Sequence, residues 1–411
     1  MDFIVRLVCM FQLGLENLLT NKDLLNRLRG KRVGLVAHPA SIDQELNHSI
    51  DLLMNHSDIQ LTCGFGPQHG IRGDVQDNMV ETENEIHPEY KIPLFSLYGE
   101  VRRPTHEMLE HADVFLFDLQ DVGCRIYTFV ATLRYLMEEA ASLGKEVWIL
   151  DRPNPVGRGV EGSLLEKEWM SFVGQAFIPM QHGLTLGELA VFFKESLNLD
   201  LTLEVVPMKN YFPSKEPWPK DLAWVNPSPN LPTFTSTRAY TGTVILEGTH
   251  LSEGRGTTRV LEVLGAPNLQ IQKILDRMKE IEKNWYEGVR VRPCFFIPMF
   301  HKFKDQLCNG VQIHSEDRYC VPSHYRPFRW VALFLKALKE THPSFEIWRS
   351  FHYEYEKDRL AIDLLTGSDF LRKWVDDPHS TPEMLESKWS KDEQQWILDR
   401  DPYLIYEREK R

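Results

Sequence analysis

The feature that most constrains the fold is a regular alternation of short apolar runs and helical patterns in the first half of the chain. Buried strands are expected at residues 32–37, 59–63, 92–98, 113–119, 146–150 and 201–207. Helices are expected at residues 23–29, 42–54, 105–111, 124–143 and 186–197. Short apolar strands that alternate with helices are typical of a mostly parallel sheet covered on both faces. The sequence therefore predicts an α/β fold.

The second half of the chain is less regular. A proline-rich stretch at 209–240 precedes an expected strand at 242–248 and an expected helix at 259–264. The pattern of apolar and polar residues changes near residue 268. After it we expect a helix at 271–287, strands at 295–300 and 311–314, and helices rich in tryptophan and charged residues. These patterns predict a larger first domain at 1–267 and a smaller α+β domain at 268–411.

Composition limits the possible partners. The 411 residues carry a formal net charge of -12, which argues against nucleic acid because phosphate binding needs a basic face. Six scattered cysteines form no C-x-x-C pair, so a zinc knuckle is not expected and a reducing compartment is favoured. No apolar run is long enough to span a membrane. The apolar N-terminus, broken by Asp2 and Arg6, is interpreted as the first helix rather than a signal peptide.

The segment from Cys63 to Asp74, CGFGPQHGIRGD, is the strongest candidate for a functional loop. Its glycines and prolines fix turns in the backbone directly after an apolar strand. Loops in this position carry the chemistry of many α/β enzymes. Its candidate functional side chains are Gln68, His69, Arg72 and Asp74.

Polar side chains also follow three other predicted strands. They are Asp118, Asp121 and Arg125 after the 113–119 strand, Asn154 after 146–150, and Glu253 and Arg255 after 242–248. The carboxyl ends of parallel strands converge on one crevice, so these groups could share a site. The alternative is that each aspartate caps a helix or turn, or forms a buried salt bridge.

Several familiar motifs are absent or incomplete. Gly157 to Gly162 matches G-x-G-x-x-G by letter, but no strand leads directly into it, so we expect no nucleotide cofactor there. Neither G-x-S-x-G nor H-E-x-x-H occurs. His69, His182 and His250 are expected to be hydrogen-bonding or core histidines rather than a metal site. The run NPSPNLP presents Asn226, Ser228 and Asn230, which suit sugar hydroxyls or an acetamido group.

Together these segments resemble the exo-β-N-acetylmuramidase (NamZ-type) family of bacterial peptidoglycan-recycling glycosidases. The matching segments are RVGLVAHPAS, GPQHGIRGD, LFSLYGEVRRPTHEML, DVFLFDLQDVGCRIYTF, ILDRPNP with EGSLLE, QHGLTLGELA, NPSPNLPT, GTVILEGTHLSEGRGTTRVLEVLGAP and NGVQIH. The resemblance implies a Rossmann-like first domain, a smaller second domain and an active cleft between them. It also implies release of terminal N-acetylmuramic acid from the non-reducing end of peptidoglycan fragments, without a nucleotide cofactor.

One position departs from the family pattern. The family loop usually reads G-P-E-H-G, and its glutamate is a leading candidate for the catalytic acid, whereas this chain has Gln68. An amide cannot titrate, although glycoside hydrolysis ordinarily needs a carboxylic acid. Another carboxylate could supply the proton, Gln68 could orient substrate in place of the glutamate, or the chain could bind glycan with weakened hydrolysis. The candidate acids are Asp74, Asp118, Asp121, Glu161 and Glu253.

The remaining expectations concern the substrate and its location. Arg72, Arg125 and Arg255 are expected to hold the lactyl carboxylate of muramic acid, and Asn154 and His182 are expected to contact the substrate. The partner would be a small glycan or muropeptide in the cytoplasm, where imported fragments are recycled. A third interpretation is an α/β hydrolase or transferase that acts on another carbohydrate or anionic metabolite.

Overall fold

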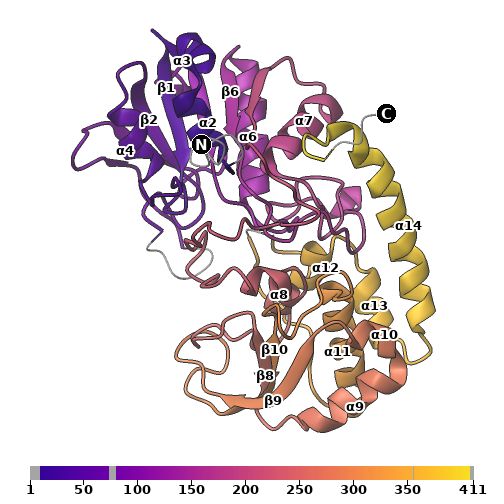
Figure 1. Ribbon diagram of the computed structural model, residues 1–411. Helices are drawn as coiled ribbons and strands as arrows, with labels where there is room; N and C mark the ends of the chain where they lie inside the picture. Colours follow the sequence, from indigo (N-terminus) through magenta and orange to yellow (C-terminus); the bar gives the residue numbers. More distant parts are fainter. Residues whose placement is uncertain (1–9, 74–79, 355, 408–411) are drawn as a thin grey trace, which may run out of the picture.

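The computed structural model describes residues 10–73, 80–354 and 356–407, and it has two lobes (Figure 1). The first lobe is built on a seven-stranded sheet with the order β3-β4-β2-β1-β5-β6-β7. Its strands are β1 (Arg32–Ala37), β2 (Gln60–Gly66), β3 (Glu85–Ile86), β4 (Pro93–Ser96), β5 (Val114–Asp118), β6 (Glu146–Leu150) and β7 (Thr202–Val206). All pairs are parallel except β3 with β4, which confirms the predicted mostly parallel sheet.

Helices cover both faces of this sheet. They are α2 (Gly14–Thr20), α3 (Lys22–Leu28), α4 (Ser49–Met54), α5 (His106–Leu109), α6 (Phe129–Ser142) and α7 (Leu186–Ser196), with the 3₁₀ turn η1 (Lys167–Trp169). The central strand β1 shows why its sequence is apolar throughout. Val36 packs into one hydrophobic core, while Val33 and Leu35 pack into a second core on the other face.

The second lobe contains a small antiparallel sheet with the order β8-β10-β9. Its elements are α8 (Ser236–Thr243), η2 (Val244–Gly248), β8 (Val263–Ala266), α9 (Ile271–Ile281), α10 (Lys283–Tyr286), β9 (Arg290–Phe296), β10 (Cys308–His314), α11 (Pro327–Thr341), α12 (Ala361–Thr366) and α13 (Phe370–Asp376). Helix α14 (Pro382–Arg400) then runs along the molecule from the second lobe to the first, and η3 (Asp401–Tyr403) follows it (Figure 1).

The clearest error of the sequence prediction lies at 242–248. These residues are helical instead of extended. Helix α8 ends at Thr243, and the 3₁₀ helix η2 continues to Gly248. Local preference favoured a strand, but α8 packs against the start of α11. A Cβ on Gly242 would lie 2.1 Å from the carbonyl oxygen of Pro327, so this glycine permits the close contact. Tertiary packing has therefore overridden the local β preference.

Other element boundaries also differ from expectation. The expected helix at 259–264 is a turn that leads into β8, and the helices expected to begin at 42 and 124 begin at Ser49 and Phe129. The helix expected at 271–287 divides into α9 and α10. The strand β8 lies before residue 268 and pairs with β10, so the chain enters the second sheet before the expected boundary.

The first helix described is α2, which begins at Gly14. The N-terminal helix expected over the preceding residues falls largely on 1–9, outside the described residues. Within the described parts of the chain, no helix combines the length and the apolar character that a membrane crossing needs.

Candidate active site

The loop that follows β2 lies at the carboxyl edge of the first sheet. The chain runs from β1 to β2 on one side of the sheet and later to β5 on the other, so the strand order reverses around β1. In open α/β sheets ligands bind at such a reversal, outside the carboxyl ends of the strands. His69 and Gly70 both have left-handed backbone, with φ of 72° and 74°, and this conformation forms the tight turn in the loop.

A cavity at this edge is lined by side chains from both lobes. The lining residues from the first part of the chain are Gln68, His69, Ile126, Tyr127, Thr128, Val173, Ser228, Asn230 and Leu231. Those from the second lobe are Tyr240, Val244, Glu247, Arg255, Leu261, Tyr353 and Glu354. The cavity between them is small, with a volume of about 40 Å³. The expected cleft between two domains is therefore present.

Two side chains of the glycine-rich loop are fixed by hydroxyl groups. Oε1 of Gln68 accepts a hydrogen bond of 2.8 Å from the hydroxyl of Thr128. Nε2 of His69 lies 3.1 Å from the hydroxyl oxygen of Ser228. That hydroxyl oxygen also accepts a hydrogen bond from the backbone N–H of Asn230. Four of the expected site residues, Gln68, His69, Ser228 and Asn230, are thus brought together at one cavity.

Arg255 also lines the cavity, within a buried group of charges. Its Nη2 donates to Glu247 and its Nε donates to Glu253. Glu253 is fully buried and also pairs with Lys302, 2.8 Å away. Burial opposes ionisation, but Lys302 and Arg255 together lower the pKa of Glu253 to about 2. This carboxylate is therefore charged at neutral pH and is poorly suited to donate a proton.

Glu354 is a cavity residue that the sequence does not single out. It lines the cavity with only 6% of its surface exposed. The hydroxyl oxygen of Tyr98 lies 3.1 Å from each of its carboxyl oxygens. Burial, assisted by the neighbouring charge of Glu247, raises the pKa of Glu354 to about 7. A carboxyl group with this property can hold a proton near neutral pH.

Three candidates expected near the 113–119 strand have structural contacts instead. Arg125 is buried and donates to the carbonyl oxygens of Ser163, Ile178 and Leu365. Asp118 forms a buried ion pair of 2.6 Å with Arg152. Asp121 accepts a hydrogen bond from the backbone N–H of Gly123, as the capping alternative anticipated. In the part of the chain that the structure describes, the residues lining the cavity do not include any of these three.

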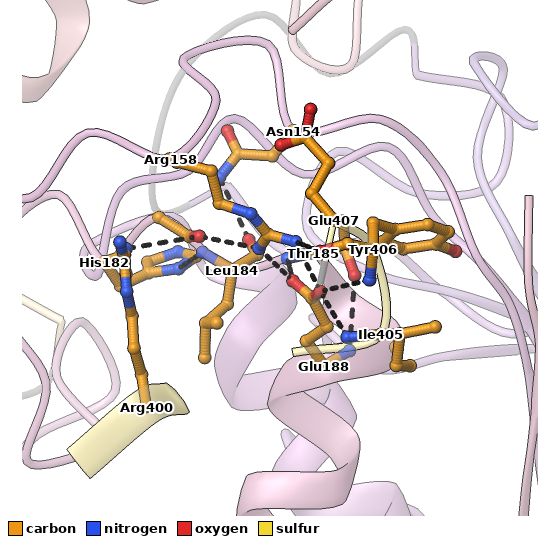
Figure 2. A network of polar contacts seen from close by, with 12 residues as sticks. Asn154, Arg158, His182, Leu184, Thr185, Glu188, Arg400, Ile405, Tyr406 and Glu407 are labelled. Carbon is orange, nitrogen blue, oxygen red and sulfur yellow. Dashed lines mark hydrogen bonds and ion pairs between the residues drawn. The ribbon is translucent and has the colours of Figure 1, made fainter. Parts of the chain in front are cut away.

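Asn154 and His182 lie in a polar network that holds the C-terminal tail against the first lobe (Figure 2). The side-chain amide of Asn154 donates to the carbonyl of Leu184. The carbonyl of His182 accepts a hydrogen bond from Arg400, and Glu188 accepts bonds from Arg158 and from the backbone of Ile405. These contacts join α7, the loop that precedes it and the tail after α14, away from the cavity.

Glu161 is likewise part of the interior rather than of the cavity. Its carboxylate oxygens accept hydrogen bonds from the backbone N–H groups of Phe328 and Arg329, at the start of α11. This position stabilises the first turn of a helix, where N–H groups lack partners within the helix. Burial raises the pKa of Glu161, although Arg326 and Arg329 lie close to it.

The last three expected residues lie outside this cavity or outside the described chain. Arg72 is paired with Glu85, and 57% of its side-chain surface is exposed. Asn226 is exposed, and Asp74 falls outside the described residues. His69, His182 and His250 do not come together, and the described residues contain no group of three or more His, Cys, Asp or Glu side chains that could hold a metal ion.

Glu247 and Glu354 also line the cavity, but little in the sequence points to them. Glu247 was placed in an expected strand, and Glu354 lies in the polar run HYEYEKD, which resembles an ordinary surface loop. One usable signal was the proximity of Glu247 to Glu253 and Arg255 in the same glycine-rich region. No local pattern around Glu354 marks it as buried.

Comparisons with known proteins agree with this architecture. Residues 33–235 match the sequence family described as "Exo-beta-N-acetylmuramidase NamZ, N-terminal", and residues 238–406 match its C-terminal counterpart. A Bacillus subtilis (strain 168) protein named peptidoglycan beta-N-acetylmuramidase NamZ is 38% identical over 396 residues, which cover 96% of this chain and 91% of that protein.

Two crystal structures of DUF1343 family proteins from Bacteroides fragilis NCTC 9343 have similar folds. The first has a TM-score of 0.83 and 30% identity, and covers 97% of this chain and 100% of its own. The second has a TM-score of 0.72 and 26% identity, with coverage of 97% and 99%. Sequence and fold therefore agree over nearly the whole length, and this chain belongs to the exo-β-N-acetylmuramidase NamZ family.

Proposed function

We propose that this protein is an exo-acting glycosidase that releases terminal N-acetylmuramic acid from peptidoglycan fragments. The observation that carries the proposal is the cavity between the lobes. Every residue that lines it lies within one of the two matched family regions. The Bacillus subtilis relative carries the name of this activity, and it aligns with the whole site.

The polar groups in the cavity suit an acidic amino sugar. Ser228 and Asn230 offer hydroxyl and amide groups, which can bond to sugar hydroxyls or an acetamido group. Nη1 of Arg255 is buried and has no hydrogen-bond partner among the described residues. Because Arg255 lines the cavity, its guanidinium would bind the lactyl carboxylate of muramic acid, which distinguishes this sugar from N-acetylglucosamine.

The proposed setting is the cytoplasm, where imported muropeptides are recycled. Cys63, Cys124, Cys294, Cys308 and Cys320 are free thiols, as a reducing compartment favours. The proposed substrate is a small glycan or muropeptide, and no nucleic acid or cofactor has a part in the reaction.

The test is release of a chromogenic aglycone from a β-N-acetylmuramide, with the β-N-acetylglucosaminide as the control substrate. The proposal would be supported if the wild-type protein turns over the muramide but not the glucosaminide. Turnover by Gln68→Glu but not by the wild type would favour a catalytically weakened glycan-binding member, for which Gln68 is the sole support. Silence from both proteins would favour a hydrolase acting on another carbohydrate, to be sought with a wider panel of glycosides.

A further inference from the structure

The cavity contains two adjacent carboxyl groups whose surroundings differ. Glu247 accepts hydrogen bonds from the guanidinium of Arg255 and, at 2.7 Å, from the hydroxyl of Tyr353. Glu354 lies beside the uncharged hydroxyl of Tyr98. Glu247 is therefore ion-paired with a cation, and Glu354 contacts a phenol of the other lobe.

The charged and titratable groups around Glu354 act in opposite directions. Burial is the largest influence and raises its pKa, and the carboxylate of Glu247 raises it further. The hydroxyl of Tyr98 and the guanidinium of Arg102 both lower it. Arg102 lies over the ring of Tyr98, with its Cζ 4.0 Å from the ring centroid. Two carboxyl groups in such different environments are a recurring pattern of acid–base pairs in enzymes.

The backbone at Glu354 is also unusual. Its φ is 45°, in the left-handed region that long side chains rarely adopt. Such a conformation costs on the order of 1–3 kcal/mol and persists where the surrounding structure imposes it, often at functional sites. Here it accompanies a side chain that lines the cavity and is nearly enclosed.

We propose that Glu354 is the general acid of the glycosidase reaction, in the role that a carboxyl group at position 68 would otherwise fill. The assignment rests on the proposed function. The Glu354 carboxyl gives its proton to the glycosidic oxygen while the bond from that oxygen to the anomeric carbon breaks and the electron pair stays with the oxygen. Water then adds its hydroxyl to the anomeric carbon, and its remaining proton restores Glu354.

Gln68 has a complementary positioning role in this scheme. Its Oε1 accepts from Thr128, so its Nε2 hydrogens are the groups that it can offer to a substrate. A neutral donor beside the sugar holds the substrate without competing with Glu354 for the proton.

The experiment compares the wild type with Glu354→Gln on two β-N-acetylmuramides that differ in leaving group. One carries 2,4-dinitrophenolate, which leaves without protonation, and the other carries N-acetylglucosamine, which must be protonated. We expect the variant to lose about 100- to 10,000-fold in kcat on the disaccharide. On the dinitrophenyl glycoside the variant should lose no more than about tenfold in kcat. This is less than a general acid typically contributes, because this leaving group needs no proton. The fall in wild-type activity as pH rises through about 7 should disappear in the variant.

Glu356→Gln is the matched control, because Glu356 is two positions away and pairs with Arg359 outside the cavity. It should retain wild-type rates on both substrates. Equal losses on the two substrates in Glu354→Gln, or no loss, would overturn the assignment while leaving the glycosidase function intact. A wild-type protein that is silent on every muramide would overturn the proposed function, and the acid assignment with it.

Glu354→Asp serves if the glutamine variant does not fold. Aspartate tolerates left-handed backbone better than most residues and keeps a carboxyl group, one methylene shorter. It should lose more activity on the disaccharide than on the dinitrophenyl glycoside, and it should keep a basic limb in its pH profile. A loss that does not depend on the leaving group would again contradict the assignment.

Discussion

The hydroxyl oxygen of Tyr98 lies 3.1 Å from both carboxyl oxygens of Glu354, although the two residues are 256 positions apart in the chain. Tyr98 follows β4 in the first lobe, and Glu354 precedes α12 in the second. The contact therefore joins the lobes at the cavity itself. A change in how the lobes meet would alter the environment of this carboxyl group.

Replacement of Tyr98 by phenylalanine should move the pH profile of the enzyme. The Tyr98 hydroxyl lowers the pKa of Glu354, so its removal should raise that pKa above its present value of about 7. A carboxyl with a higher pKa keeps its proton to higher pH, and the basic limb of kcat/KM should shift upward. Measurement of kcat/KM between pH 5 and 9 checks this expectation. A shift toward lower pH would contradict it.

Gln68→Glu should not activate the protein. The introduced carboxyl group would enter a buried position beside the hydroxyl of Thr128, in a cavity that already holds Glu247 and Glu354. We expect kcat on the disaccharide to stay equal to that of the wild type or to fall, because the proton already comes from Glu354. A rise of tenfold or more, measured under the same conditions, would favour the weakened-enzyme interpretation.

Arg255→Lys should reduce discrimination between the two amino sugars. Lysine keeps the positive charge but not the guanidinium fork that bonds to both Glu247 and Glu253 at the edge of the cavity. The ratio of kcat/KM for the muramide over the glucosaminide should fall about 10- to 100-fold, which is the effect of a lost charged hydrogen bond of about 1.5–3 kcal/mol. An unchanged ratio with a uniform loss of rate would indicate a structural role only.

Glu161→Gln should affect stability rather than catalysis. The carboxylate of Glu161 satisfies the backbone N–H groups of Phe328 and Arg329, and an amide oxygen can replace only part of that interaction. The free energy of unfolding in urea should fall by about 1–3 kcal/mol. The kcat of the folded variant should match that of the wild type. A large loss of kcat without loss of stability would return Glu161 to the list of catalytic candidates.

Tyr406→Phe should weaken the attachment of the C-terminal tail. The hydroxyl of Tyr406 donates a 2.7 Å hydrogen bond to the buried carboxylate of Asp151. Its loss should lower the free energy of unfolding by about 1.5–3 kcal/mol, the usual range for a hydrogen bond to a charged group. Tyr319→Phe is a suitable control because Tyr319 is exposed. Equal stability of the two variants would contradict the proposed attachment.

The central part of the fold could be predicted from sequence because its strands are apolar on both faces. The prediction for 32–37 coincides with β1, and that for 146–150 coincides with β6. The elements that failed are those whose conformation depends on distant partners. Residues 242–248 prefer a strand locally, but Gly242 lies against Pro327 of α11, and no pattern near residue 242 contains that information.

The candidate site shows the same difference between residues that a local pattern marks and residues whose surroundings come from distant parts of the chain. Glycine and proline mark the loop of Gln68 and His69, and glycines flank Arg255, so the sequence singles out three residues that line the cavity. Arg125 was misjudged because a sequence does not distinguish an arginine that faces a cavity from one that donates to interior carbonyls. The sequence does not mark Glu354 as a cavity residue, because its contact with Tyr98 comes from the first lobe.

The contact between Asp151 and Tyr406 also affects how the protein is made. Asp151 leaves the ribosome 255 residues before Tyr406 does, and until then its buried position at the end of β6 lacks one of its donors. Domains usually fold in order as they emerge during synthesis. Here the first lobe reaches its final hydrogen bonding only after residue 406 has been translated, so nascent chains that stop before it should be targets for chaperones and proteases.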